Sequence, residues 1–253
     1  MEEKFWYLKN CDLFERLTPE QVQQLESRSK SRDFKRGQVI YLPTDQADSV
    51  LLLGTGRVKI YHITNEGKQA VLALVDPGEV FGELGLFESS QSPREEFAEA
   101  MEASRVILIP RKEMQVLMEA HPTVSLGVSK LMGLRRKRVE RRLKSLLFRS
   151  NRDRLVHLLL ELAEKYGKPT VEGVILGIKL SHQDLASIIG STRETVTVLL
   201  GELQQEGQLT IQRRKIILSN LNRLAASIDV EPPTLAFPED LGNRVLRQAR
   251  AQS

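Results

Sequence analysis

Cysteine is almost absent from this sequence, and its absence excludes several kinds of site. Among the 253 residues, Cys11 is the single cysteine. One cysteine cannot form an intrachain disulfide, and it cannot by itself hold an iron–sulfur cluster or a cysteine-ligated structural zinc ion. The first residues, MEEKFWYLKN, start acidic and contain no continuous apolar core. We therefore expect no secretory signal and a reducing, cytoplasmic location.

Long hydrophobic runs and catalytic clusters are also missing. No window of the sequence approaches the ~18 consecutive apolar residues of a membrane-spanning helix. The four histidines, His62, His121, His157 and His182, are far apart in the chain. Neither a nucleophile–base pair nor a Walker-type loop accompanies them. The sequence therefore predicts no enzyme and no metal site, and it disfavours haem sensing and iron–sulfur sensing.

Positive charge is concentrated in the second half of the chain. Residues 1–110 contain 13 Lys and Arg against 18 Asp and Glu, whereas residues 111–253 contain 24 against 15. Two ordinary solvated surfaces would also produce this difference. A basic region is nevertheless what binding to a polyanion requires, so the second half is the candidate for nucleic-acid binding.

The first half consists of short apolar runs separated by turns that contain glycine. The runs are Gln38–Pro43, Ser49–Leu53, Arg57–Ile63, Gln69–Val75, Glu79–Phe87 and Arg105–Pro110. A short helix precedes them, with Thr18 as its N-cap and Pro19 as its first residue. Strands as short and as evenly spaced as these predict an antiparallel sandwich or roll.

One long helix is predicted from Pro122 to about Phe148. At 100° per residue, apolar side chains and three arginines fall on the same face of this helix. The apolar residues are Val124, Val128, Leu131, Val139 and Leu146, and the arginines are Arg135, Arg138 and Arg142. The apolar seam predicts pairing with a second copy of the chain. A buried arginine needs a counter-charge, so the arginines predict either a protein carboxylate or a bound anion.

The segment SHQDLASIIGSTRETVTVLLGELQQEG has the pattern of a helix-turn-helix. Ser181, with Asp184 three residues later, has the spacing of a capping box at the start of a first helix. Gly190 provides the tight turn, because it has no side chain to obstruct one. Ser191 and Glu194 repeat the capping spacing, so Ser191 is predicted to cap a second helix that ends at Gly207.

The start of this second helix carries side chains suited to reading DNA. Arg193 can donate two hydrogen bonds to guanine, and Glu194 can accept one from cytosine. Thr192, Thr195 or Thr197 can reach a phosphate or a thymine methyl group. The following segment, LTIQRRKIILSN, predicts a β-hairpin wing whose basic tip contacts phosphates. The basic residues of the wing are Arg213, Arg214 and Lys215.

These features resemble the cyclic-AMP receptor protein and FNR family of bacterial transcription regulators. The resemblance is carried by GRVKIYHITNEGKQAVLALVDPGEVFGELGLFE, by the long helix, and by LSHQDLASIIGSTRETVTVLLGEL. It implies an α+β fold and a homodimer that binds a two-fold symmetric site on double-stranded DNA, with RNA polymerase as a further partner. The implied parts are a cyclic-nucleotide-binding-type β-roll (1–120), a dimerisation helix (121–148), a winged helix-turn-helix (149–220) and an extension without an assigned role (221–253).

The resemblance gives a role to the loop FGELGLFESSQSPREEF, residues 81–97. In cyclic-AMP-responsive members, the positions of Gly82, Glu83 and Leu84 face the ribose and the phosphate. The position of Arg94 pairs with the phosphate in those members. All four residues are present here, so the resemblance implies an anion-binding pocket in the β-roll.

Three departures argue against cyclic AMP as the effector. Glu95 stands where cyclic-AMP-responsive members usually have serine. A carboxylate within a few ångström of a phosphodiester costs about 1 kcal/mol or more. Val139 and Glu140 stand where such members place two small hydroxyl residues against adenine.

Another branch of the family, the cyanobacterial nitrogen-control regulators that sense 2-oxoglutarate, is also similar. Arg94, Arg135 and Glu140 match the ligand-binding arginines and glutamate of that branch, whereas Glu83 replaces an apolar residue. Three alternatives therefore stay open: an unidentified effector or none, a dicarboxylate such as 2-oxoglutarate, and a cyclic nucleotide. Without an effector, a glutamate of the chain would pair with the arginines, and the regulator would be constitutively competent to bind DNA. The glutamates available for this pairing are Glu83, Glu95 and Glu96.

In the helix-turn-helix, Arg193 and Glu194 match the base-reading pair of the family. Some members have a third base-contacting arginine at the position of Val198, so we expect the half-site to share only part of the best-known family sequence. The other DNA-binding positions that we predict are Ser181, Gln183, Ser191, Thr192, Thr195 and Thr197. A module of another class, which senses a nucleotide and controls a partner protein, is disfavoured because the winged helix would have no role in it.

Overall fold

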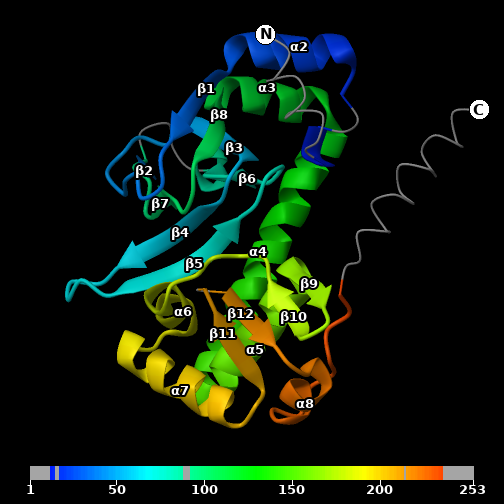
Figure 1. Ribbon diagram of the computed structural model, residues 1–253. Coiled ribbons are helices and arrows are strands. Elements are labelled where there is room, and N and C mark those ends of the chain that lie inside the picture. The colour runs from blue at the N-terminus through cyan, green and yellow to red at the C-terminus, as the bar shows by residue number, and fades with distance from the viewer. Residues whose placement is uncertain (1–11, 15–16, 88–91, 214, 236–253) are drawn as a thin grey trace, which may run out of the picture. The chain divides into compact units, whose positions relative to one another are not determined.

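The chain divides into two compact units, residues 1–141 and residues 142–253. The structure is a computed structural model (Figure 1). It describes residues 12–14, 17–87, 92–213 and 215–235, with the backbone alone at Arg138.

The first unit is built on two four-stranded antiparallel sheets (Figure 1). One has the strand order β1-β8-β3-β6, and the other has the order β2-β7-β4-β5. The strands are β1 Lys30–Phe34, β2 Val39–Tyr41, β3 Ser49–Thr55, β4 Val58–Ile63, β5 Gln69–Val75, β6 Val80–Phe81, β7 Phe97–Ala100 and β8 Ser104–Pro110. The predicted antiparallel roll is confirmed.

The prediction for the run Glu79–Phe87 is wrong over most of its length. Only Val80–Phe81 is a strand, and a 3₁₀ helix, η2, occupies Glu83–Leu86. Gly82 separates the two with a left-handed φ of 69°, which ends the extended conformation. Strands β1 and β7 were not predicted, because KSRDF and FAEA lack the apolar residues on which the prediction relied.

The central strands are apolar on both faces because each face packs in a different core. Leu51 and Leu53 of β3 lie between the two sheets, in a cluster that also contains Phe81. Val50 and Leu52 point the other way, since successive side chains of a strand alternate. They pack against helices of the same unit, namely η1 (Asp12–Phe14), α2 (Pro19–Arg28), α3 (Arg111–Ala120) and the start of α4 (Pro122–Phe148).

Helix α2 confirms the predicted N-cap. Thr18 Oγ1 accepts a hydrogen bond from the Gln21 N–H at 3.4 Å, and Gln21 Oε1 accepts one from the Thr18 N–H at 2.9 Å. Pro19 is the first residue of this helix.

The long helix α4 is present, but its apolar face is used in two ways. Val124 and Val128 are fully buried in the core of the first unit, and Leu131 packs against that core. The prediction that the whole face meets a partner helix is therefore wrong for these three residues. Val139 and Leu146, further along the same face, are exposed.

The second unit combines helices with a four-stranded sheet of order β11-β12-β10-β9. Its elements are α5 Asn151–Tyr166, β9 Gly167–Thr170, β10 Gly173–Leu176, α6 His182–Ile189, α7 Arg193–Gln205, β11 Leu209–Gln212, β12 Lys215–Leu218 and α8 Leu221–Ala226. Strands β11 and β12 form the predicted hairpin. No helix in the described part of the chain is long and apolar enough to cross a membrane.

Candidate DNA-binding surface and effector pocket

The first helix of the helix-turn-helix is held by a capping box. Ser181 Oγ accepts a hydrogen bond from the Asp184 N–H at 3.1 Å, and Asp184 Oδ2 accepts one from the Ser181 N–H at 2.8 Å. These bonds satisfy N–H groups that lack a partner within the helix. Helix α6 ends at Gly190, whose φ of 66° is left-handed and favours glycine. The predicted cap and the predicted turn are confirmed.

The second predicted cap is wrong by one residue. Thr192, and not Ser191, is the N-cap of α7, and its Oγ1 accepts a hydrogen bond from the Thr195 N–H at 3.2 Å. The Ser191 N–H is bonded instead to the Ala186 carbonyl at 3.0 Å, which completes the end of α6. Because Ser191 finishes one helix, the next residue is the first that is available to cap the other.

Helix α7 is amphipathic, and one side of it is presented to solvent. In its first two turns the exposed residues are Arg193, Glu194, Thr197 and Val198, and the buried residues of the helix are Val196, Leu200 and Leu203. The buried side fixes the rotation of the helix about its axis. The predicted base-reading side chains therefore lie together on the exposed side, at the N-terminal end of the helix.

One residue on this surface was missed in the sequence. His182, the first residue of α6, has its Nδ1 2.8 Å from Thr197 Oγ1 on α7. Thr197 Oγ1 also donates a hydrogen bond to the Arg193 carbonyl at 2.8 Å. The sequence shows that His182 follows the cap directly, but only the packing of the two helices shows that it reaches Thr197.

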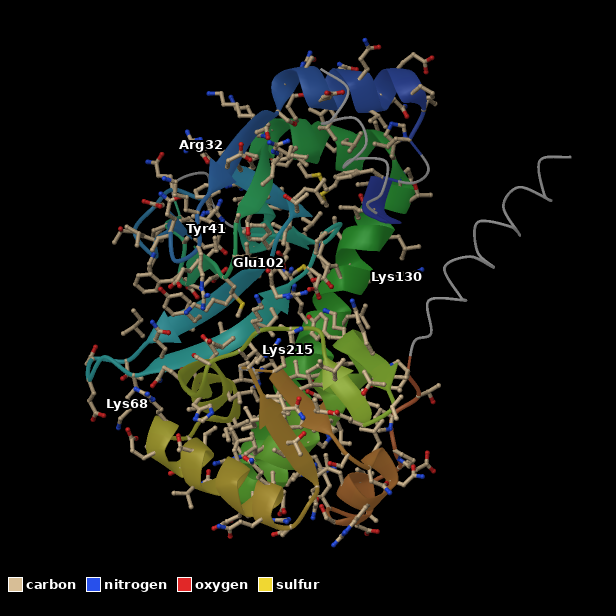
Figure 2. All side chains as sticks on the ribbon, in the orientation of Figure 1. Arg32, Tyr41, Lys68, Glu102, Lys130 and Lys215 are labelled. Atoms are coloured by element: carbon tan, nitrogen blue, oxygen red, sulfur yellow. The ribbon has the colours of Figure 1, made fainter. Side chains whose placement is uncertain are left out.

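The wing presents a basic tip. Lys215 opens β12 (labelled in Figure 2), and Arg213 precedes it with a φ of 48°; both residues are exposed. Arg214 lies outside the described residues. Gln183, on α6, is also exposed, and its Nε2 donates to Ser187 Oγ at 3.3 Å.

In the first unit, the loop predicted to hold an anion contains a buried arginine. Arg94 Nη2 donates to the Ser49 carbonyl at 2.7 Å, and Nη1 donates to the Gly82 carbonyl at 3.3 Å. Its guanidinium carbon lies 4.2 Å from the centre of the Tyr41 ring. A Cβ on Gly82 would come within 2.5 Å of Arg94 Nη1, so both the left-handed φ and this close approach require glycine here.

Arg135 of α4 has an internal counter-charge. Its Nη1 forms an ion pair with Glu83 Oε1, and its Nη2 donates to the Val80 carbonyl. The Glu83 side chain is 3% exposed and that of Arg135 is 22% exposed. Of the two partners foreseen for this arginine, the structure therefore contains the protein carboxylate. The other carboxylate oxygen of Glu83 is buried and has no hydrogen-bond partner among the described residues.

A second carboxyl group, that of the half-buried Glu96, lies near Arg94. The Tyr41 hydroxyl, on β2, donates to Glu96 Oε1 at 3.2 Å (Tyr41 is labelled in Figure 2). Burial raises the pKa of Glu96, and the charge of Glu83 raises it further, against the opposing effects of Tyr41 and Arg94. Burial also raises the pKa of Tyr41 well above its ordinary value. Tyr41 was not predicted, because nothing local in the sequence connects it with this loop.

The cavity at this loop is small, with a volume of about 10 Å³. That is about the space of one water molecule. Its lining residues are Ala47, Gly82, Leu84, Gly85, Pro93, Arg94, Glu95 and Glu96. Four of the predicted effector residues do not line it. Glu83 and Arg135 pair with each other, Val139 is exposed on α4, and Glu140 accepts a hydrogen bond from Arg136 Nε at 2.8 Å.

Two further arginines of α4, Arg138 and Arg142, were predicted to share the face of Arg135. The side chain of Arg138 lies outside the described residues. Arg142 belongs to the second unit, where burial lowers its pKa and the charge of Glu161 opposes that shift.

Both units match models of known families. A cyclic nucleotide-binding domain matches residues 31–121, and a Crp-like helix-turn-helix domain matches residues 153–227. The global nitrogen regulator of Synechocystis sp. is 34% identical over 187 residues, which are 74% of this chain and 83% of that regulator. The chain belongs to the CRP/FNR family of transcription regulators. The predicted family is thereby confirmed.

Other members of the CRP/FNR family show the same similarity. A CRP-like cAMP-activated global transcriptional regulator of Mycobacterium tuberculosis is 26% identical over 220 residues, covering 86% of this chain and 96% of that regulator. A solved CRP/FNR-family regulator from Thermus thermophilus has a TM-score of 0.63 and 31% identity, covering 79% of this chain and 98% of that one. This CRP/FNR protein is therefore a transcription regulator with a helix-turn-helix DNA-binding domain, as predicted.

Proposed function

We propose that this CRP/FNR regulator binds a two-fold symmetric DNA site as a homodimer and reads each half-site with α7. The observation that carries the proposal is the exposed N-terminal end of α7, where Arg193 and Glu194 lie together in solvent while Val196, Leu200 and Leu203 of the same helix are buried. Arg193 donates to guanine O6 and N7, and Glu194 accepts from cytosine N4. Val198, exposed one turn further on, offers only apolar contact, and it suits a thymine methyl group.

The homodimer is supported by an uncovered apolar seam on α4. Met132, Val139 and Leu146 are spaced seven residues apart, and Leu143 lies on the same side; of these four, Val139, Leu143 and Leu146 are exposed in the single chain. Seven-residue spacing of apolar side chains is the pattern by which two helices pair in a coiled coil. A second copy of the chain is thus the partner that covers this seam.

The DNA-reading proposal is tested by selecting binding sites from a random DNA pool with the purified protein. We expect a palindrome with half-sites spaced by about one helical turn, roughly 10–10.5 base pairs. Replacing Arg193 with alanine should cost about 1–3 kcal/mol on that site and relax one base position. The same replacement at Gln205, in the last turn of α7, is the control. If Arg193→Ala selects the same DNA site with the same base preferences as the wild type, Arg193 does not read a base.

We propose further that Glu83 serves the effector domain as a resident carboxylate. It supplies Arg135 with the negative charge that an anionic effector would otherwise bring, and the cavity beside Arg94 has no room for such a molecule. The regulator would then be competent to bind DNA without a ligand. Calorimetric titration with 2-oxoglutarate, cyclic AMP and cyclic GMP should show no binding to the wild type at micromolar concentrations.

A response to an anionic effector is the second candidate, and Arg94 favours it. This guanidinium is buried, and the described residues give it carbonyl and aromatic contacts but no ion pair. If calorimetry shows saturable binding of one of the three ligands to the wild type, and Arg94→Ala abolishes that binding, the protein responds to an effector and Glu83 is not a substitute for one. The ligand that binds would then identify the effector as a dicarboxylate or a cyclic nucleotide.

The remaining proposals rest on family membership. The relatives are transcription regulators, so we propose a regulatory role and not an enzymatic one, in the cytoplasm, where the DNA target lies. RNA polymerase is proposed as a partner because a regulator of this type must influence transcription from the site it occupies.

A further inference from the structure

A chain of two hydrogen bonds connects the two helices of the helix-turn-helix on their exposed side. It runs from His182 Nδ1 to Thr197 Oγ1, at 2.8 Å, and from Thr197 Oγ1 to the Arg193 carbonyl, also at 2.8 Å. His182 is the first residue of α6, whereas Arg193 and Thr197 occupy the first two turns of α7. The chain therefore begins on one helix and ends on the backbone of the residue proposed to read guanine.

The direction of both hydrogen bonds follows from the available protons. A carbonyl oxygen only accepts, and the Thr197 hydroxyl has a single proton, so that proton is used on Arg193. Donation from a threonine to the carbonyl four residues earlier is a familiar arrangement in helices. The Thr197 oxygen must then accept from His182, which places a proton on Nδ1 of the imidazole.

This arrangement decides what Thr197 can offer to DNA. With its proton used and one lone pair occupied, its oxygen keeps one free lone pair, and its methyl group stays available. Phosphate oxygens are acceptors and need a donor, which Thr197 no longer provides. In the major groove an A·T pair offers both the thymine methyl group and the adenine N6 amino donor, whereas a G·C pair offers no methyl group.

We propose that His182 is a positioning residue that makes Thr197 a reader of an A·T pair and prevents it from contacting a phosphate. The proposal rests on the proposed role of α7 in reading DNA. It chooses between the two roles that the sequence left open for Thr197, and it assigns to His182 a part in specificity. His182 acts through Thr197, by holding the hydroxyl in one rotamer.

The proton on Nδ1 can be tested without DNA. Nitrogen-15 NMR of the full-length protein, labelled at its four histidines, should show a protonated Nδ1 for the signal that disappears in His182→Asn. The hydrogen bond should also be lost in Thr197→Val, which has nearly the same shape and no hydroxyl. A neutral ring with its proton on Nε2 would overturn the proposal, because Thr197 would then have to donate to His182.

The effect on specificity is tested on the selected site and on variants of it in which each A·T pair is replaced by G·C. The wild type should bind less tightly when the A·T pair read by Thr197 is replaced, and this position is distinguished from one read by Val198 because it is the one that changes in Thr197 variants. Thr197→Ser keeps the hydroxyl and loses the methyl group, so it should lose that discrimination. His182→Ala should reduce the discrimination about 2- to 10-fold, the usual value of one hydrogen bond. Undiminished discrimination in both variants would overturn the proposal.

A rescue variant separates positioning from folding. The side-chain amide of asparagine can present an N–H close to the place of Nδ1, so His182→Asn should regain most of the discrimination that His182→Ala loses. Equal losses in the two variants would overturn the positioning role. If the wild type selects no DNA sequence at all, the proposed function fails, and the NMR result still reports the tautomer. If the wild type selects a site and His182→Ala discriminates on that site equally well, the role of His182 fails while the proposed function stands.

Discussion

At the scale of single residues, buried charges determine how the effector domain is organised. A guanidinium withdrawn from water needs a carboxylate or several hydrogen-bond acceptors. Arg135 has the carboxylate of Glu83, whereas Arg94 has two backbone carbonyls and the face of Tyr41. The two arginines that the family resemblance marks as ligand-binding are therefore both engaged within the chain.

Replacing Glu83 with glutamine should open the domain to anions. The change removes the negative charge opposite Arg135 and nearly preserves the volume of the side chain. We expect a loss of about 1–3 kcal/mol of stability, because a buried charged hydrogen bond is weakened. We also expect measurable binding of 2-oxoglutarate in calorimetry where the wild type shows none.

The matched control for this change is Glu119→Gln, an exposed glutamate on α3 of the same unit, outside the predicted pocket. It should leave both stability and anion binding as they are in the wild type. Anion binding by the wild type, unchanged in Glu83→Gln, would contradict the idea that Glu83 is a resident carboxylate.

Glu96 should make the first unit less stable as the pH rises. Burial raises its folded-state pKa above the ordinary value of 4.5. Well below pH 4.5 the group is protonated in both the folded and the unfolded state. As the pH rises through the raised pKa, the folded protein must hold a charge in a half-buried position, and stability is lost.

Replacing Glu96 with glutamine removes this titration. The difference in unfolding free energy between Glu96→Gln and the wild type should therefore grow in favour of the variant as the pH increases from about 4.5. Urea unfolding at a series of pH values measures this difference. A constant difference across the series would show that the environment of Glu96 does not disfavour its charge.

At the scale of elements, we propose different tasks for the β11–β12 wing and for helix α7. Helix α7 presents side chains that match base edges, whereas the β11–β12 hairpin presents cations that match phosphates of any sequence. Arg213 lies at the hairpin tip and Lys215 opens β12, and both are exposed. Their contribution should be electrostatic.

Replacing Arg213 and Lys215 together with alanine should weaken binding to all DNA sequences by a similar factor. The slope of log affinity against log salt concentration should become shallower by about one for each phosphate that the wing no longer neutralises. Binding measured on the selected site and on unrelated DNA at several salt concentrations tests this. A weakening confined to the selected site would mean that the wing reads bases.

At the scale of the whole molecule, α4 offers a matched pair of substitutions for testing the dimer. Val139 and Leu134 are both 58% exposed, but they lie about 140° apart around the helix at 100° per residue. Val139 belongs to the seven-residue seam, and Leu134 does not. An aspartate at Val139 should place a charge inside the dimer interface, whereas one at Leu134 should face solvent.

Sedimentation equilibrium distinguishes these cases, since the chain has a mass of 28.7 kDa. We expect twice that mass for the wild type and for Leu134→Asp, and the single-chain mass for Val139→Asp. The monomer should also lose affinity for the palindromic site, because each half-site would bind independently. If Val139→Asp still has the mass of a dimer, the dimer interface does not include this seam.

Local patterns in the sequence were sufficient for much of the fold. The cap of α2, the capping box of α6 and the turn at Gly190 were predicted correctly, because these features involve residues that are neighbours in the chain. The cap at Ser191 failed for a local reason as well. Its spacing to Glu194 suits a cap, but its backbone was already committed to ending α6.

What the sequence by itself determined was the order and type of the main elements, the family and the surface proposed to meet DNA. What only the tertiary structure decided was which charged and polar side chains meet. Tyr41 and Glu96 are 55 residues apart, and His182 and Thr197 are 15 apart on different helices. Glu83 could have faced a ligand or Arg135, and the local sequence permits both. Packing of α4 against the roll places a cation beside that buried carboxylate, and the need to pair a buried charge fixes the result.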